Sequence, residues 1–196
     1  MQLALFDFDN TLTTCDTYSR FLRQVATPAQ LARARWTVGP WLLGYRAGVL
    51  SARAIRARVT RVVFGGRAVE QIAAQARDYA EQVLPGLLDP KMMQRLQWHR
   101  AQGHEVALVS ASIDLYLQPW CARQGLGLIC NRLEHRDGTF SGRYAAIDCG
   151  PHKARLVRER YDLGRYERVH AYGDSSEDRP MLALAHERWY RGRRVA

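Results

Sequence analysis

The sequence of 196 residues has few cysteines and no long apolar run. Its four cysteines, Cys15, Cys121, Cys130 and Cys149, lie far apart, with no C-x-x-C pair and no neighbouring histidine at zinc-ligand spacing. We therefore expect reduced thiols in a cytoplasmic protein, rather than a disulfide framework or a zinc finger. The chain does not open with a basic segment followed by an apolar one, so we expect no secretory signal.

The most apolar segment, Trp36 to Tyr45, is too short to span a bilayer and is followed at once by Arg46. We interpret it as the core of a helical subdomain. The alternative is a peripheral membrane contact, because aromatic side chains flanked by arginines suit a lipid headgroup interface. No repeat or low-complexity tract is present, and a composition of 47% hydrophobic and 24% charged residues indicates a packed globular protein.

Acidic residues are scarce, with 19 against 29 basic ones, which gives a formal charge of +10 and a pI near 9.9. The surplus is uneven, because residues 14–85 hold eleven arginines and only four acids. A positive field attracts a polyanion, a membrane surface or a phosphorylated substrate. No nucleic-acid-binding motif is recognisable, so we expect no nucleic-acid partner.

Three short apolar runs end in small or acidic residues and are separated by helical segments. They are Leu3 to Phe8, Glu105 to Ser110 and Val169 to Tyr172, and the segment Pro90 to Gln102 has a helical pattern. This order predicts an α/β fold with a parallel sheet. Ligands of such sheets bind beyond the carboxyl ends of the strands.

The arginine-rich stretch has helical patterns and no strand signal, so we expect a helical insertion at 14–85 within a core formed by 1–13 and 86–196. The patterns cover Thr17–Val25, Pro28–Trp36, Ser51–Val63 and Ala68–Val83. Within the core, Leu133 to Tyr144 predicts a β-hairpin around Asp137-Gly138, a dipeptide typical of tight turns.

Two acidic groups follow predicted strands. Asp7 and Asp9 stand at i and i+2, where strand alternation puts both carboxylates on one face and favours a bound cation. Asp174 and Asp178 can complete an oxygen-rich site that suits Mg²⁺. The alternatives are solvated turn residues at the first position and a helix N-cap by Asp174 or Ser175 at the second.

Ser110 lies at the end of the second strand, just before a helical segment, where its hydroxyl and the next amides suit phosphate or simply cap the helix. Lys153 stands at the predicted start of a helix, Lys153 to Tyr161. The helix dipole disfavours a cation there, which indicates a functional role, although a solvated lysine is the alternative.

The four segments DFDNT, VSAS, the single Lys153 and YGDSSEDRPML occur in this order, each at a strand end or a helix start. Together they resemble the four motifs of the haloacid dehalogenase (HAD) superfamily, over nearly the whole chain. Within it, the chain is similar to the phosphoserine-phosphatase-like branch (subclass IB). The resemblance implies a Rossmann-like core with an inserted helical cap domain.

By this resemblance Asp7 is the nucleophile that forms an aspartyl phosphate, and Asp9 is the general acid and base. Thr11, Ser110 and Ala111 correspond to the phosphate-binding positions, and Lys153 offsets negative charge. Mg²⁺ is implied as cofactor, held by Asp7, Asp174 and the backbone carbonyl of Asp9, with Asp178 as ligand or support.

The sequence departs from many relatives at Asn10, where they have glycine; asparagine tolerates the same left-handed turn. Asp9 itself favours phosphate ester hydrolysis, because the dehalogenase branch lacks this second aspartate. The resemblance implies that cap residues read the leaving group of a small phosphorylated metabolite. The candidates are Asp16, Arg20, Arg23, Arg53, Arg56 and Arg58.

Two alternatives remain at this stage. The segment HERWYR at 186–191 is similar to phosphatidylglycerophosphatase relatives of this branch, which keeps a lipid phosphate as a candidate substrate. The charge of +10 keeps a noncatalytic, anion-binding protein on the same fold. The clustered acids argue against that second alternative, because an anion-binding module gains nothing from them.

Overall fold

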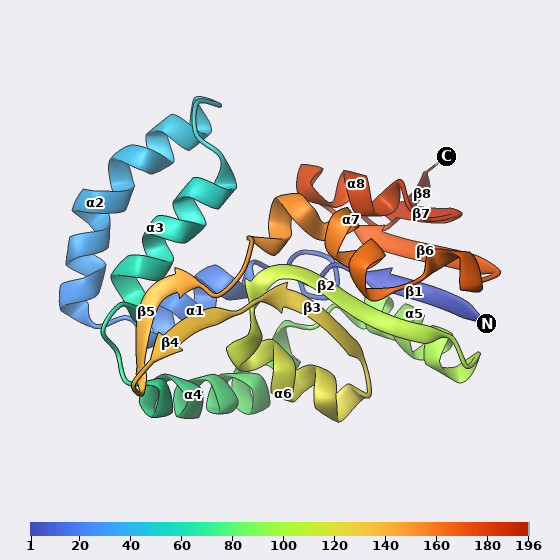
Figure 1. Ribbon diagram of the computed structural model, residues 1–196, viewed down its shortest axis with the longest axis horizontal. Coiled ribbons are helices and arrows are strands. Elements are labelled where there is room, and N and C mark those ends of the chain that lie inside the picture. Colours follow the sequence, from blue (N-terminus) through green and yellow to red (C-terminus); the bar gives the residue numbers. More distant parts are fainter. Residues whose placement is uncertain (196) are drawn as a thin grey trace.

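The centre of the structure is a six-stranded sheet with the strand order β3-β2-β1-β6-β7-β8 (Figure 1). This computed structural model describes residues 1–195, and the side chain of Arg46 lies outside the described part. The strands are β1 (Gln2–Phe6), β2 (Glu105–Ile113), β3 (Gly127–Asn131), β6 (Arg168–Gly173), β7 (Glu187–Tyr190) and β8 (Arg193–Val195). All neighbouring pairs are parallel except β7 with β8. The predicted parallel α/β sheet is confirmed.

Both faces of the sheet are buried, which explains why its central strands read as continuous apolar runs. Ala4 and Phe6 belong to one hydrophobic cluster, whereas Leu3 and Leu5 belong to another. The first cluster packs on α5 (Pro90–Ala101) and α6 (Asp114–Gln124), and the second on α7 (Cys149–Arg160) and α8 (Arg179–Leu182). The core is thus a helix–sheet–helix sandwich.

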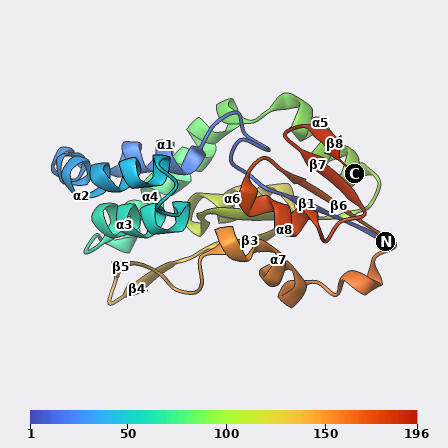
Figure 2. The same ribbon diagram turned by 90° about the horizontal axis from the view of Figure 1, so that it is seen from above.

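The insertion after β1 is helical, as predicted, and projects from one end of the sheet (Figure 2). It contains α1 (Thr17–Val25), α2 (Pro28–Arg46), α3 (Ala52–Phe64) and α4 (Val69–Asp78). A π-helical turn (Tyr79–Val83) and a 3-10 turn (Leu84–Leu87) lead back to the core. Ser51 caps α3 and Thr27 forms a capping box on α2, which explains where these helices begin.

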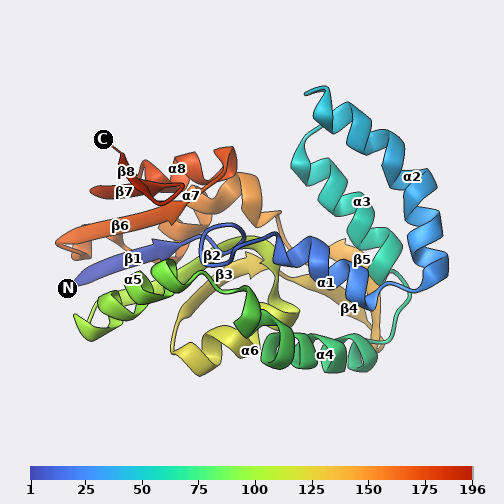
Figure 3. The same cartoon turned by 180° about the vertical axis from the view of Figure 1, so that it is seen from behind.

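Helix α2 differs from the prediction in length and in burial. It continues through Pro40, and only Val38 of its apolar half is buried. Trp36 is 83% exposed and Leu43 is 67% exposed, so the interpretation of this segment as the core of the cap is wrong. The turn to α3 projects away from the sheet (Figure 3). Across residues 1–195, every helix is too short or too polar to cross a bilayer.

The predicted hairpin is confirmed as β4 (Leu133–Arg136) and β5 (Thr139–Tyr144). Asp137 and Gly138 both have positive φ, as a two-residue hairpin turn requires. The hairpin forms its own two-stranded sheet and packs β5 against α3. It therefore lies with the helical insertion in space, although it comes from the second half of the chain.

Candidate active site

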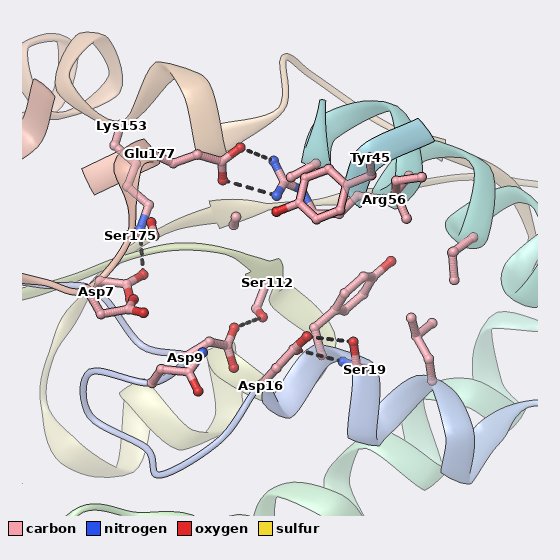
Figure 4. Close-up of a pocket in the computed structure, with 18 of the residues that line it drawn as sticks. Asp7, Asp9, Asp16, Ser19, Tyr45, Arg56, Ser112, Lys153, Ser175 and Glu177 are labelled. Atoms are coloured by element: carbon pink, nitrogen blue, oxygen red, sulfur yellow. Dashed lines mark hydrogen bonds and ion pairs between the residues drawn. The ribbon is translucent and has the colours of Figure 1, made fainter. Parts of the chain in front are cut away.

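Residues of the predicted motifs meet in a pocket of about 340 Å³ at the carboxyl ends of β1 and β6 (Figure 4). Asp7 follows β1 and its amide donates to the carbonyl of Tyr172, while Asp174 follows β6. The core contributes Asp7, Asp9, Asn10, Ala111, Ser112, Lys153, Asp174, Ser175 and Glu177 to the lining. The position of the pocket agrees with the rule for ligands of open parallel sheets.

Lys153 links the first and last motifs. Its Nζ donates to Asp7 Oδ1 at 2.5 Å and to Asp178 Oδ1 at 2.6 Å, and only 3% of its side chain is exposed. Helix α7 begins at Cys149, capped by Asp148, so Lys153 lies one turn inside it. The predicted start of this helix at Lys153 is wrong; the ion pairs, not the helix terminus, account for the buried lysine.

Burial and charge set the protonation of this trio. Burial raises the pKa of Asp7, against the opposing effect of the Lys153 ammonium. Burial alone raises the pKa of Asp178 too, but Lys153 and the hydrogen bonds donated to it lower the net value. Burial disfavours the charged form of Lys153, yet the two carboxylates outweigh it and raise its pKa. The lysine is therefore a permanent cation that faces Asp7.

Asp9 is held beside the pocket by the start of α1 and the end of β2. Its Oδ1 accepts from the amide and the hydroxyl of Thr17, at 2.6 and 2.5 Å, and its Oδ2 accepts from the hydroxyl of Ser112. Burial, followed by the charge of Asp16, raises the pKa of Asp9 to about 6. A carboxyl group with such a pKa exchanges protons near neutral pH.

The acidic residues expected to hold a metal converge. Oxygens of Asp7, Asp174 and Asp178 lie within 4.8 Å of one another. Both oxygens of Asp178 are engaged, since Oδ2 accepts from the amides of Asp174 and Ser175 and from the Ser175 hydroxyl. Gly173 allows this loop, because a Cβ there would lie 2.5 Å from Asp178 Cβ. Asp178 thus positions the loop, while Asp174 lines the pocket.

Only some of the predicted phosphate-binding residues line the pocket. Strand β2 continues past Ser110 to Ile113, so Ser110 does not precede a helix, and its buried Oγ accepts from the amide of Ser112. Ala111 and Ser112 line the pocket, whereas Ser110 and Thr11 do not. Thr11 Oγ1 is buried without a hydrogen-bond partner, beside a second cavity that Asp174 also lines. Asn10 has a φ of 57°, the left-handed turn that was predicted.

The cap contributes two charged residues to the pocket, Asp16 and Arg56, among apolar side chains. Of the predicted candidates, Arg20, Arg23, Arg53 and Arg58 do not line it. The apolar part of the lining comes from Tyr18, Leu22, Leu42, Tyr45, Ala52, Ile55 and Val59. Asp16 caps α1 and accepts from the amide and hydroxyl of Ser19.

Arg56 ties the cap to the core. Its guanidinium donates to both carboxylate oxygens of Glu177, at 2.9 and 3.0 Å, and to Asp148 at 3.1 Å. Burial opposes its charge, but Glu177 and Asp148 raise its pKa. A Cβ at Gly150 would lie 2.3 Å from this guanidinium, so glycine leaves room for the contact. One bridge thereby joins α3, the start of α7 and the loop after β6.

Sequence reasoning missed Ser112, Thr17, Asp148 and Glu177. Ser112 was visible, because residues two apart in a strand share a face and Ser110 was already a candidate. Asp148 precedes a helical pattern as an N-cap residue would. The sequence indicates no role for Thr17 or Glu177, apart from their closeness to a motif.

The comparison with known families decides the class of the protein. A model of the haloacid dehalogenase-like hydrolases matches residues 4–183. The chain belongs to this family. The HAD fold and the phosphatase type of hydrolase predicted for the chain are confirmed.

The chain is similar to two curated proteins over nearly its whole length. Protein CicA of Caulobacter vibrioides is 36% identical over 203 residues, covering 96% of this chain and 85% of CicA. Histidinol-phosphatase of Neisseria meningitidis is 25% identical over 197 residues, covering 94% and 87%. A substrate-bound phosphoserine phosphatase has a TM-score of 0.70 at 18% identity, covering 96% and 84%, and therefore shares the fold.

Proposed function

We propose that this HAD phosphatase is a Mg²⁺-dependent phosphomonoesterase that hydrolyses a small phosphorylated metabolite through an aspartyl phosphate on Asp7. The observation that carries the proposal is the buried contact of Asp7 with Lys153 in a pocket that Asp9 and Asp174 also line. A permanent cation beside a carboxylate lets the carboxylate approach a phosphate dianion. The cytoplasmic location stays a prediction.

In the first step an oxygen of Asp7 attacks phosphorus, and the bond to the leaving oxygen breaks. That oxygen takes the proton of Asp9, whose raised pKa supports the protonated form near pH 6. In the second step Asp9 accepts a proton from water, and the water oxygen attacks phosphorus. The bond to Asp7 breaks, which restores the carboxylate and releases inorganic phosphate.

The donor set fits Mg²⁺, because Asp7 and Asp174 offer hard carboxylate oxygens into the same pocket. The backbone carbonyl of Asp9 is the third protein ligand that we propose. Asp178 supports this set by fixing Lys153 and the loop at Asp174. The ion, when bound, supplies charge compensation between the phosphate and the carboxylates.

The cap half of the pocket supports a leaving group with an amine and an apolar part. Asp16 is the acid that the cap contributes to the pocket, whereas both oxygens of Glu177 and the Asp148 carboxylate engage Arg56. A substrate carboxylate would have to compete with those two acids for the guanidinium. We therefore expect an amino alcohol phosphate such as histidinol phosphate to be hydrolysed with higher kcat/KM than phosphoserine.

The experiment is release of p-nitrophenol from p-nitrophenyl phosphate by the parent and by Asp7→Asn, with Mg²⁺ or with EDTA. We expect hydrolysis only by the parent with Mg²⁺. Equal, metal-independent release by both proteins would refute the proposed catalysis. A panel containing histidinol phosphate, phosphoserine and lysophospholipid phosphates then ranks the leaving groups.

The exposed end of α2 favours one second candidate, a lipid phosphate in a membrane interface. Leu42 and Tyr45 line the pocket and are also 44% and 47% exposed, and Leu43 and Val49 beside them are exposed as well. An apolar tip on an arginine-rich cap suits an anionic lipid surface. Leu43→Asp should then abolish sedimentation with vesicles containing anionic phospholipid while hydrolysis of p-nitrophenyl phosphate is unchanged. Failure of the parent to bind these vesicles rules out this candidate.

A further inference from the structure

Three histidines gather at the amino end of the sheet, on the side of α5. His99 lies in the last turn of α5, His104 directly precedes β2, and His170 lies in β6. His170 is four residues before Asp174, which separates it from the phosphatase pocket by about 13 Å along the strand. Nothing in the proposed hydrolysis uses these residues.

The ring nitrogens are close enough to share one ion. One nitrogen of each ring lies within 4.8 Å of the others, and His99 Nδ1 is 2.8 Å from His104 Nδ1. The outer nitrogens have partners of their own: His99 Nε2 lies 2.8 Å from the hydroxyl of Tyr172, and His170 Nε2 lies 2.7 Å from Gln2 Oε1. Metal-bound histidines commonly donate their second nitrogen in this way.

The tautomers of the three rings decide which inner nitrogens of the cluster have lone pairs. When His170 Nε2 donates to Gln2 Oε1, the neutral ring has its lone pair on Nδ1, and this atom lies 3.6 Å from Glu187 Oε2. When His99 Nε2 donates to Tyr172, its Nδ1 likewise has a lone pair toward His104. A cation among these atoms would accept these lone pairs in place of the hydrogen bond between His99 and His104.

The imidazoles are in the protonation state that a metal ligand needs. Burial, with the charges of His170, His104 and Arg95, lowers the pKa of His99 to about 3. Burial also lowers the pKa values of His104 and His170, although Glu187 acts in the opposite direction on His170. Neutral imidazole rings bind a metal ion without first losing a proton.

We propose that His99, His104 and His170 bind one transition-metal ion of the borderline class, for which Zn²⁺ is the probe. Imidazole nitrogens favour such ions over Mg²⁺, and three histidines are a known zinc ligand set. A water or the Glu187 carboxylate is available for a fourth position. The ion joins α5 to β2 and β6, and therefore stabilises the native state in proportion to its occupancy.

The test is calorimetric titration of untagged protein with Zn²⁺ alone, in the parent, His104→Ala and His135→Ala. His104 is half-buried and His135 is an exposed histidine on the hairpin, so the second variant controls for histidine content. An Asp174→Asn background removes binding at the acidic pocket. We expect one Zn²⁺ per chain in the background protein and in its His135→Ala variant. In the His104→Ala variant we expect binding at least about 100-fold weaker, because even loss of an outer partner costs 10–100-fold.

X-ray absorption of the Zn²⁺-loaded parent gives an answer that needs no variant. Scattering from about three imidazole rings supports the site, in keeping with zinc ligation by histidine. An oxygen-only shell, no stoichiometric binding, or equal affinity in His104→Ala and the parent would overturn it and leave a hydrogen-bonded histidine cluster. Hydrolysis of p-nitrophenyl phosphate with Mg²⁺ should be the same in His104→Ala and the parent, whatever the outcome.

Discussion

Buried ionisable groups are stabilised in opposite ways at the carboxyl and the amino ends of strands β1, β2 and β6. Beyond the carboxyl ends of β1 and β6, Asp7 and Asp178 share the ammonium of Lys153. At the amino ends, His99 and His170 are buried, and among residues 1–195 the carboxylate nearest to His170 Nδ1, that of Glu187, is 3.6 Å away, beyond hydrogen-bond distance. The pKa values of both histidines are lowered. At the carboxyl end the buried side chains stay charged because they form ion pairs, and at the amino end the buried histidines are neutral. Only the paired end provides the charge that phosphate chemistry requires.

Removing the cation of the paired end should have the largest effect. Lys153→Met leaves Asp7 and Asp178 buried without their partner, and we expect the free energy of unfolding to fall by about 3–5 kcal/mol. Phosphatase activity should be lost as well. Urea denaturation measures the first effect, with Lys91→Met on the exposed face of α5 as the matched control. Equal stability of the two variants would mean that the buried pairing contributes little.

Breaking the bridge between cap and core should have an intermediate effect. Arg56→Ala leaves Asp148 buried and releases α3 from the loop at Glu177. We expect a loss of roughly 10- to 100-fold in kcat/KM, because a cap residue that lines the pocket is no longer held in place. Steady-state kinetics measures this, with Arg53→Ala on the exposed side of the same helix as control. An unchanged KM and kcat in Arg56→Ala would show that the bridge does not contribute to catalysis.

The buried neutral histidines at the amino end should make the stability of the protein sensitive to acid, which is the smallest of the three effects. The pKa of His99 is about 3 in the native state and near its ordinary value of 6.5 when unfolded. Between these values the unfolded chain binds the extra proton, so stability is present above pH 6.5 and falls as the pH drops toward 3. With EDTA present, we expect His99→Gln to lose about 1 kcal/mol less than the parent between pH 7 and pH 5.5. Thermal unfolding at several pH values measures it, and parallel curves for both proteins would contradict the lowered pKa.

Local patterns were sufficient for much of the fold. The apolar runs ending at Phe8, Ser110 and Tyr172 and the Asp137-Gly138 turn predicted their elements, because each is specified by neighbouring residues. Strands β3, β7 and β8 were missed, since they are short and show no clear alternation, β3 and β7 being half-buried and β8 exposed. The prediction of α2 ended at Trp36, yet the helix continues to Arg46 and contains Pro40, although proline usually breaks a helix.

The site was predictable where a motif fixed it and not where distant segments meet. Asp7, Lys153 and Asp178 were named from their positions in the sequence and from the resemblance, and the structure brings them into contact. The partners of Arg56 lie 92 and 121 residues away along the chain, so no local pattern indicates them. The contact between His99 and His170 likewise exists only once β6 pairs beside β1.

The most direct measurement of the central claim is capture of the phosphoryl group on Asp7. Asp9→Asn should be mixed with p-nitrophenyl phosphate and Mg²⁺, because p-nitrophenolate leaves without an acid while attack by water still needs a base. The account predicts that an acyl phosphate accumulates, and that borohydride reduction converts residue 7 to homoserine. A phosphoryl group on another residue, or product release with no covalent phosphoprotein in either Asp9→Asn or the parent, would contradict it.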